Sequence, residues 1–148
     1  MIRRAGHPPH RGQRYQLRAG AYAILPLNDR VLLTLQNTDM PDLQLPGGGI
    51  DPGESPWQAL HREVREETGW GVTAPRRVGA FRRFVYMPEY DIWAEKLCHI
   101  FLARPTRRLS DPTEPDHTAL ILPWQEAARS LRNEGDRRFL LRYAARRP

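Results

Sequence analysis

The chain has very little cysteine: Cys98 is the only one among 148 residues, so no internal disulfide bond can form. Small secreted domains often depend on disulfide bonds, whereas a chain without them is typical of a reducing compartment. We therefore expect a cytoplasmic protein that is held together by a hydrophobic core, and the chain is long enough to bury one.

Long apolar runs are also absent. The longest runs have the length of a β-strand, and none approaches the roughly 20 residues of a transmembrane helix, so we expect no membrane partner. The basic start of the chain has no apolar segment behind it and thus lacks the pattern of a secretory signal. No internal repeat or linker divides the sequence. We expect a flexible basic tail at residues 1–15 and a single domain at residues 16–148.

Lysine is scarce as well, since Lys96 is the only one and arginine supplies nearly all of the positive charge. The formal net charge is +6. A basic balance favours anionic partners such as nucleotides, phosphates or nucleic acid. A solvated, arginine-rich surface explains the same composition equally well, so the net charge alone does not select a partner.

Short apolar runs between turn residues predict a domain of strands with a few helices. The expected strands are residues 20–27, 30–36, a short segment from residue 42, 78–87, 96–104 and 118–123. Asn28 and Asp29 are typical of a hairpin turn between the first two strands. Residues 88–95 are expected to form a loop, and two closing helices are expected at residues 124–131 and 136–147.

The clearest helix start in the chain is at Ser55. Ser55 is a good N-cap, Pro56 suits the first helical position, and Gln58 completes a capping box. Gly69 is a natural C-terminal stop. The pattern predicts a helix at residues 56–68.

Glu63, Glu66 and Glu67 fall on one face of that helix, within an arc of roughly 100°. Each like-charge pair costs the helix about 0.2–0.5 kcal/mol, and a cation bound between the carboxylates would offset this repulsion. Carboxylate oxygens are the ligands that Mg²⁺ and Mn²⁺ prefer. A solvated charged face is the alternative, and the helix taken by itself favours that alternative.

The glycine-rich segment before the helix, "LPGGGIDPGE", changes this balance. It is not a Walker A loop, because no Gly-Lys-Ser/Thr follows, and Pro52 stands where a Rossmann fingerprint needs its third glycine. Together with the helix it closely resembles the Nudix box, the signature of the Nudix hydrolase family. Seven identities match, which happens by chance about once in 10⁸ windows. They are Gly48, Glu54, Arg62, Glu63, Glu66, Glu67 and Gly69.

The resemblance implies an α+β fold, a Nudix-like α/β/α sandwich in which a mixed, curved β-sheet lies between helices. It is densest over residues 45–70. Two departures are visible. Trp70 stands where the box usually ends in an aliphatic residue, and His117 stands where the family often supplies a late carboxylate. Glu114 and Asp116 lie just upstream, so a late metal ligand remains an open question.

The activity that the resemblance implies is metal-dependent hydrolysis of the diphosphate linkage in a nucleoside diphosphate joined to another group. That substrate would be a nucleotide sugar, a dinucleoside polyphosphate or a molecule like a nucleoside triphosphate. The implied cofactor is Mg²⁺ or Mn²⁺, which neutralises phosphate oxygens and lowers the pKa of bound water. The implied ligands are Glu63, Glu66, Glu67 and the backbone carbonyl of Gly47 or Gly48.

Glu54 and Arg62 are implied to form an ion pair that fixes the glycine-rich loop against the helix. The proton acceptor for water is expected among the acids near the metal. The candidates are Glu63, Glu66, Glu89, Asp91 and Glu95.

Candidate substrate contacts are Tyr86, Tyr90, Trp93 and Arg83, although aromatic residues in strands are more often part of the core. No histidine has ligand spacing, and none is assigned to metal. A non-catalytic nucleotide sensor, or an RNA-binding or decapping protein, are the alternatives. The expected partner is a small nucleotide derivative, with nucleic acid as the alternative, and the expected assembly is a monomer or a homodimer.

Overall fold

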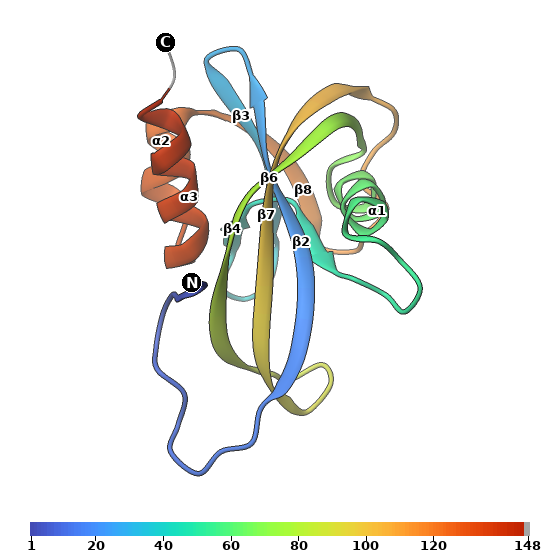
Figure 1. Ribbon diagram of the computed structural model, residues 1–148. Helices are drawn as coiled ribbons and strands as arrows, with labels where there is room; N and C mark the ends of the chain where they lie inside the picture. The colour runs from blue at the N-terminus through green and yellow to red at the C-terminus, as the bar shows by residue number, and fades with distance from the viewer. Residues whose placement is uncertain (147–148) are drawn as a thin grey trace.

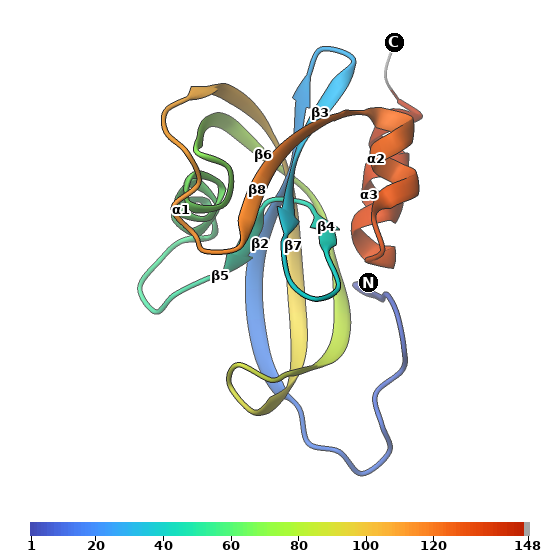
Figure 2. The same cartoon turned by 180° about the vertical axis from the view of Figure 1, so that it is seen from behind.

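The computed structural model describes residues 1–146 and has a β-sheet with helices on both faces (Figures 1 and 2). The strands are β1 Arg3–Arg4, β2 Gln16–Leu27, β3 Arg30–Gln36, β4 Asp42–Gln44, β5 Gly47–Gly49, β6 Trp70–Met87, β7 Ile92–Arg108 and β8 His117–Pro123. The helices are α1 Pro56–Thr68, α2 Trp124–Ser130 and α3 Glu134–Ala144. Within these 146 residues, no helix has both the length and the apolar character that crossing a membrane requires.

The sheet is mixed, with strand order β1-β6-β7-β2-β3-β4, while β5 pairs with β2 and β8 pairs with β3. The pairs β1–β6 and β2–β7 are parallel, and the other pairs are antiparallel. Helix α1 covers one face, and α2 and α3 cover the other (Figures 1 and 2). The predicted α/β/α sandwich with a mixed sheet is confirmed.

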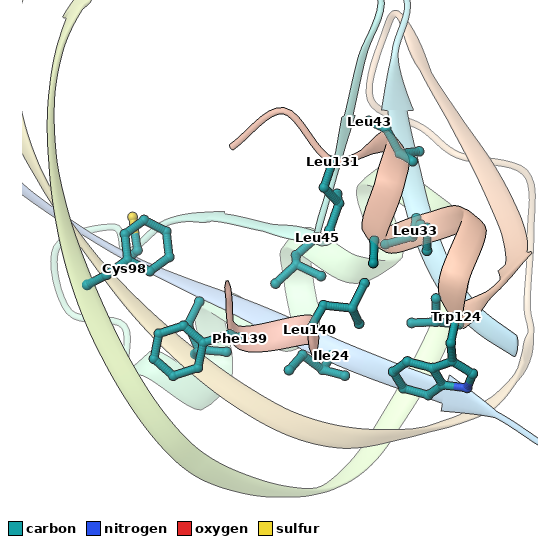
Figure 3. Packing of buried hydrophobic residues seen from close by; sticks show 14 of the residues in the cluster. Ile24, Leu33, Leu43, Leu45, Cys98, Trp124, Leu131, Phe139 and Leu140 are labelled. Atoms are coloured by element: carbon teal, nitrogen blue, oxygen red, sulfur yellow. The ribbon is translucent and has the colours of Figure 1, made fainter. Parts of the chain in front are cut away.

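Two hydrophobic clusters hold these layers together, because alternate residues of a strand point to opposite faces of the sheet. On β2, Ile24 belongs to the cluster beneath α2 and α3, and Leu25 belongs to the cluster beneath α1. Figure 3 shows the first cluster, in which Leu140 of α3 lies beside Ile24 of β2. In the second cluster, Leu60 of α1 is completely buried.

The hairpin formed by β6 and β7 is longer than the sequence pattern predicted. Strand β6 begins at Trp70 rather than residue 78, and β7 runs from Ile92 to Arg108 rather than over residues 96–104. The region near Pro75 had the composition of a loop. The register of the pair shifts at three places there, and such irregularities let a strand continue through residues that do not fit a regular ladder.

Two smaller corrections concern the glycine-rich loop and the last helix. Residues Gly47–Gly49 were expected in a loop, but they form β5, which pairs with residues Gly20–Tyr22 of β2. Helix α3 begins at Glu134, because Asn133 caps it through bonds from two backbone N–H groups. It ends at Ala144, and residue 147, where the predicted helix ended, lies outside the described residues.

The N-terminal segment has contacts with the sheet. Arg3 and Arg4 pair with β6, and Ala5 is buried with its backbone N–H 2.8 Å from the carbonyl oxygen of Arg82. His10 stacks edge-on against Trp93, with ring centroids 5.2 Å apart. The mobility expected for residues 1–15 stays a prediction, and these contacts weigh against it.

Candidate active site

Helix α1 has the predicted bounds and the predicted caps. The Ser55 hydroxyl accepts a hydrogen bond from the Gln58 backbone N–H at 3.1 Å, and the Gln58 side chain accepts one from the Ser55 N–H at 2.8 Å. Gly69 ends the helix in the left-handed conformation at φ 79°. Because Leu60 and Val64 are buried against the sheet, the neighbouring face of the helix is fixed at the edge of a cavity.

That cavity has a volume of about 300 Å³ and lies between α1, the glycine strand β5 and the middle of the sheet. Glu63, Glu67 and residues 47–49 form one part of its wall. The other part contains Arg83, Tyr90, Lys96, His117, Asn133 and Asp136. Acidic and basic side chains therefore face the same space, as a site for a metal with an anionic ligand requires.

Glu67 is the most buried of the three clustered glutamates, with 6% of its surface exposed. Its Oε1 accepts a hydrogen bond from the Gly47 backbone N–H at 2.8 Å. Burial raises the pKa of Glu67 well above its usual value, and the nearby carboxylates of Glu63, Glu114 and Glu66 raise it further. Burial thus disfavours the charged form of this carboxyl group, and a cation beside it would favour that form.

His117 lies on the other side of Glu67, with its Nδ1 3.6 Å from Glu67 Oε2 and 2.8 Å from the Thr34 hydroxyl oxygen. Burial lowers the pKa of His117, which favours the neutral imidazole. The contact with the threonine hydroxyl is a hydrogen bond, and an ion pair with Glu67 would require a protonated His117. No histidine was assigned to the metal site from the sequence, although His117 stands where the family often supplies a late carboxylate.

Glu63 reaches the cavity because the opposite backbone is glycine. A Cβ atom on Gly48 would lie 2.5 Å from the carboxyl carbon of Glu63, so the two groups could not coexist without a shift. Burial raises the pKa of Glu63, and this effect is opposed by a hydrogen bond from Arg62. The glycine of the box therefore makes room for a carboxylate.

Arg62 is the centre of an ion-pair network that joins the helix to the preceding loop. Its Nε lies 2.7 Å from Glu54 Oε2, and its Nη2 lies 2.8 Å from Glu54 Oε1, which is the contact predicted from the sequence. It also donates to Glu63 at 2.9 Å and to the Gly49 carbonyl at 3.1 Å. The guanidinium lowers the pKa of Glu54 to about 2.

Glu66 differs from its two neighbours. It is not part of the cavity wall, and its carboxylate lies 3.4 Å from the Arg62 guanidinium. Over the described part of the chain, no three His, Cys, Asp or Glu side chains are already grouped to hold an ion. Arg62 Nη1 bonds to both Glu63 and Glu66. The donor set nevertheless fits a divalent cation, since it consists of hard oxygens, one of them deeply buried.

The other sequence-predicted residues divide into two groups. Arg83, Tyr90 and Glu89 line the cavity. Tyr86 and Trp93 do not; their rings stack on each other with centroids 5.2 Å apart, near the turn of the β6–β7 hairpin. Of the remaining candidate bases, Asp91 accepts a hydrogen bond from Tyr86 and Glu95 pairs with Arg82 at 3.3 Å. Substrate contacts by any of these side chains stay a prediction.

Sequence reasoning missed the deepest part of the cavity wall, which is formed by Tyr22, Cys98 and Asp136. Asp136 is 3% exposed, and burial raises its pKa to about 7. Burial also raises the pKa of the Cys98 thiol to about 12, so this cysteine is not a thiolate nucleophile. Asp136 is one of two acidic residues in the first turn of α3, and no local pattern distinguishes it from the exposed Glu134.

Comparisons with known proteins agree with this geometry. A family model of the NUDIX domain matches residues 14–143. The chain is 34% identical over 74 residues to a Bacillus subtilis (strain 168) protein provisionally named 8-oxo-dGTP diphosphatase, covering 50% of each chain. It is 35% identical over 91 residues to an RNA pyrophosphohydrolase of Erythrobacter litoralis (strain HTCC2594), covering 60% of this chain and 52% of the relative. The matches thus span about half the length of these curated relatives.

A solved structure supports the fold independently. A NUDIX hydrolase from Nitrosomonas europaea superposes with a TM-score of 0.73 at 20% identity, covering 88% of this chain and 90% of the other. Because the family model covers most of the chain and the glycine strand, capped helix and ion-pair network stand where the motif requires them, the chain belongs to the Nudix family.

Proposed function

We propose that the protein is a divalent-metal-dependent pyrophosphohydrolase that cleaves the diphosphate linkage of a nucleoside diphosphate joined to another group. The observation that carries this proposal is the burial of Glu67 in a cavity that also has Arg18, Arg83 and Lys96 in its wall. A buried carboxylate needs a cation, and these arginine and lysine side chains suit phosphate oxygens. Two relatives named as a diphosphatase and as an RNA pyrophosphohydrolase support a nucleotide or an RNA end as the substrate.

Glu63 and Glu67 are the residues that would hold the metal, with Glu66 and the Gly47 carbonyl as further oxygen donors. When bound, the ion would neutralise the phosphate oxygens and lower the pKa of a bound water. Glu54 is not a ligand in this proposal. Its bidentate contact with Arg62 keeps the guanidinium in place, and Arg62 in turn orients Glu63.

The proton of the attacking water needs an acceptor on the cavity wall. Glu63 and Glu89 both line the cavity. Asp91 and Glu95 are engaged with other side chains and do not line it, so they are weaker candidates. Arg83 and Tyr90 lie on the same wall, where they would contact the phosphate chain and the nucleoside of the substrate.

The test is turnover of a panel of nucleotide sugars, dinucleoside polyphosphates, nucleoside triphosphates and 5′-triphosphorylated RNA, with Mg²⁺ or Mn²⁺ and with products identified. We expect Glu67→Gln to reduce the rate by about three orders of magnitude or more, because the charge that holds the metal is lost. The melting temperature of the variant without metal should not be lower than that of wild type. The amide oxygen still accepts a hydrogen bond from the Gly47 N–H, and one of the mutually repelling carboxylates has been removed.

Glu126→Gln is the matched control, since Glu126 is exposed on α2, far along the chain from the motif. It should leave the rate unchanged. Binding of nucleotides without any turnover across the panel would contradict hydrolysis and indicate a nucleotide sensor. A rate for Glu67→Gln within a few-fold of the wild-type rate would show that Glu67 is not the metal ligand on which hydrolysis depends.

A further inference from the structure

Two basic hollows lie outside the candidate active site, one on each side of the N-terminal segment where it packs against α3. Each has a volume of about 440 Å³. The near hollow has Arg83, Arg132 and Arg137 in its wall, together with residues 5–7. The far hollow has Arg3, Arg77, Arg138 and Arg142 in its wall. Figure 1 shows the N-terminal end of the chain beside one end of α3, and residues of both segments line the two hollows.

The near hollow adjoins the active-site cavity, because Arg83 and Asn133 line both of them. Arg83 comes from the middle of β6, and Asn133 is the N-cap of α3, so both positions are fixed by secondary structure. The near hollow is therefore the next space that a ligand extending past these two residues would meet.

The positive charge of the near hollow is largely uncompensated. Over residues 1–146, the side chains of Arg83, Arg132 and Arg137 have no hydrogen bond or ion pair. Glu134 is the acid in this wall, and both of its oxygens are occupied: one accepts from Gly6 N–H at 3.1 Å and the other from Arg138 at 2.9 Å. Three guanidinium groups beside one carboxylate leave a net positive charge, which is suited to phosphate oxygens.

The far hollow is also positively charged. It has four arginines and no acid in its wall, and of these only Arg138 is paired with a carboxylate. The Arg142 guanidinium lies over the Phe139 ring at 4.9 Å, and Arg77 contacts His99 at 3.3 Å. Their orientation is thus held by neutral groups, which leaves the positive charge available to an anion.

We propose that the two hollows bind the phosphodiester backbone of a single-stranded RNA whose 5′-terminal phosphates lie in the active-site cavity. A mononucleotide would end within the cavity, so it would leave both hollows unused. An RNA chain begins with a nucleoside triphosphate, so its 5′ end carries the linkage that the cavity is proposed to cleave. The placement of that end rests on the proposed function, whereas backbone binding by the hollows can be measured without any hydrolysis.

The test compares three double variants by fluorescence anisotropy with a 3′-labelled, 5′-triphosphorylated RNA of ten nucleotides. Arg132→Ala with Arg137→Ala removes charge from the near hollow, and Arg77→Ala with Arg142→Ala removes it from the far hollow. Arg65→Ala with Arg107→Ala is the control with the same loss of charge, because Arg65 and Arg107 are exposed elsewhere on the surface. Thermal melts establish that all three variants fold.

We expect the near-hollow variant to bind RNA at least tenfold more weakly and the control to stay within twofold. The slope of log K against log salt should become shallower by about 1.4, which corresponds to two phosphate contacts on a single strand. The far-hollow variant should lose affinity only for RNA longer than a few nucleotides. In hydrolysis assays, kcat/KM for the RNA should fall in the near-hollow variant, while turnover of a free nucleotide is unchanged.

Equal RNA affinity of the near-hollow variant and the control would overturn the proposal. An equal loss of free-nucleotide and RNA turnover would also overturn it, since the arginines would then act inside the cavity. An acidic peptide of equal charge that displaces the RNA at the same concentration would identify a protein partner instead. If RNA binding depends on the hollows but no substrate is hydrolysed, the proposed function fails while backbone binding stands.

Discussion

At the scale of single residues, burial gives the same side chain different chemistry at neighbouring positions. Glu66 and Glu67 are adjacent in the chain, yet Glu67 is buried against Gly47 and Glu66 is half-exposed beside Arg62. The buried carboxyl has a pKa well above its usual value, because water no longer stabilises its charge. A metal bound at Glu67 would replace that lost solvation.

The effect of burial on a carboxyl pKa can be tested at Asp136 by measuring the free energy of unfolding. Its pKa is raised to about 7, and its hydrogen bond comes from the Leu45 N–H at 3.3 Å. The folded chain keeps a proton on Asp136 that the unfolded chain releases above about pH 4, so the free energy of unfolding falls as the pH rises from about 4 to 7. Asp136→Asn removes this titration and keeps an acceptor for Leu45.

We expect Asp136→Asn to be more stable than wild type at pH 8, by about 1–4 kcal/mol, and to be equal to it at pH 4. Urea unfolding at a series of pH values measures the difference. A variant whose stability runs parallel to that of wild type across this range would show that Asp136 titrates normally.

A substitution at Gly48 tests whether Glu63 needs the space that the glycine leaves. In Gly48→Ala, the new Cβ would meet the Glu63 carboxylate at 2.5 Å, so the side chain must move out of its position. We expect hydrolysis to fall about tenfold or more while stability changes by less than about 1 kcal/mol, since the far end of a flexible side chain is displaced. Gly49→Ala is the control, because its Cβ would meet no atom within 4 Å. Similar rates for the two variants would contradict the prediction.

At the scale of elements, the glycine-rich loop and α1 act as one unit because Arg62 bonds to both. It contacts Glu54 in the loop, the Gly49 carbonyl at the end of β5, and Glu63 one residue further along the helix. Five donors on a planar group allow these contacts to form together, which a lysine could not reproduce. The position of the helix face relative to the glycine strand thus depends on one side chain.

Removing that side chain should change how the protein responds to acid. The low pKa of Glu54 means that its contact contributes stability above about pH 4.5, and this contribution is lost as the pH falls towards 2. In Arg62→Ala the pKa of Glu54 should rise towards its usual value, and the acid-dependent loss of stability between about pH 5 and 2 should become smaller. Carboxyl NMR titration and melts at each pH provide the measurement.

Arg65→Ala is the control on the same helix, because Arg65 is exposed and its side chain forms none of the bonds that Arg62 forms. Its acid profile should match that of wild type. An unchanged pKa of Glu54 in Arg62→Ala would mean that another group, such as the Asp51 backbone N–H at 2.9 Å, is sufficient to hold the carboxylate.

At the scale of the whole molecule, the sheet separates two hydrophobic clusters, and the cavity opens between the elements that these clusters fix. Helix α1 depends on one cluster, and α3 depends on the other. Phe139 of α3 packs on Phe81 of β6 with ring centroids 6.1 Å apart, and a Cβ on Gly79 would lie 2.6 Å from its ring. This packing holds Asn133 and Asp136 at the cavity.

We expect Phe139→Ala to lower the free energy of unfolding by about 3–5 kcal/mol, because it leaves a void in a packed cluster. The melting temperature should fall by about 10 °C. Leu141→Ala, two residues away and 51% exposed, should change stability by less than about 1 kcal/mol. Calorimetry of the three proteins measures this, and similar melting temperatures for both variants would show that α3 contributes little to folding.

The sequence by itself determined the features whose causes lie within a few residues. The bounds of α1 follow from Ser55, Gln58 and Gly69, because capping acts over one helical turn. The contact between Glu54 and Arg62, eight residues apart, could be predicted because the box fixes their spacing. Residue chemistry and spacing also matched the Nudix box, and that resemblance implied the sandwich fold.

Only the tertiary structure decided which of these residues face the cavity and in what state. The bond from Gly47 to Glu67 spans 20 residues, and the bond from Leu45 to Asp136 spans 91. Burial and pKa depend on such distant partners, which periodicity along the chain does not encode. The length of β6 could not be predicted from the sequence for a similar reason. Its irregular end is held by pairing with β7 and not by its own composition.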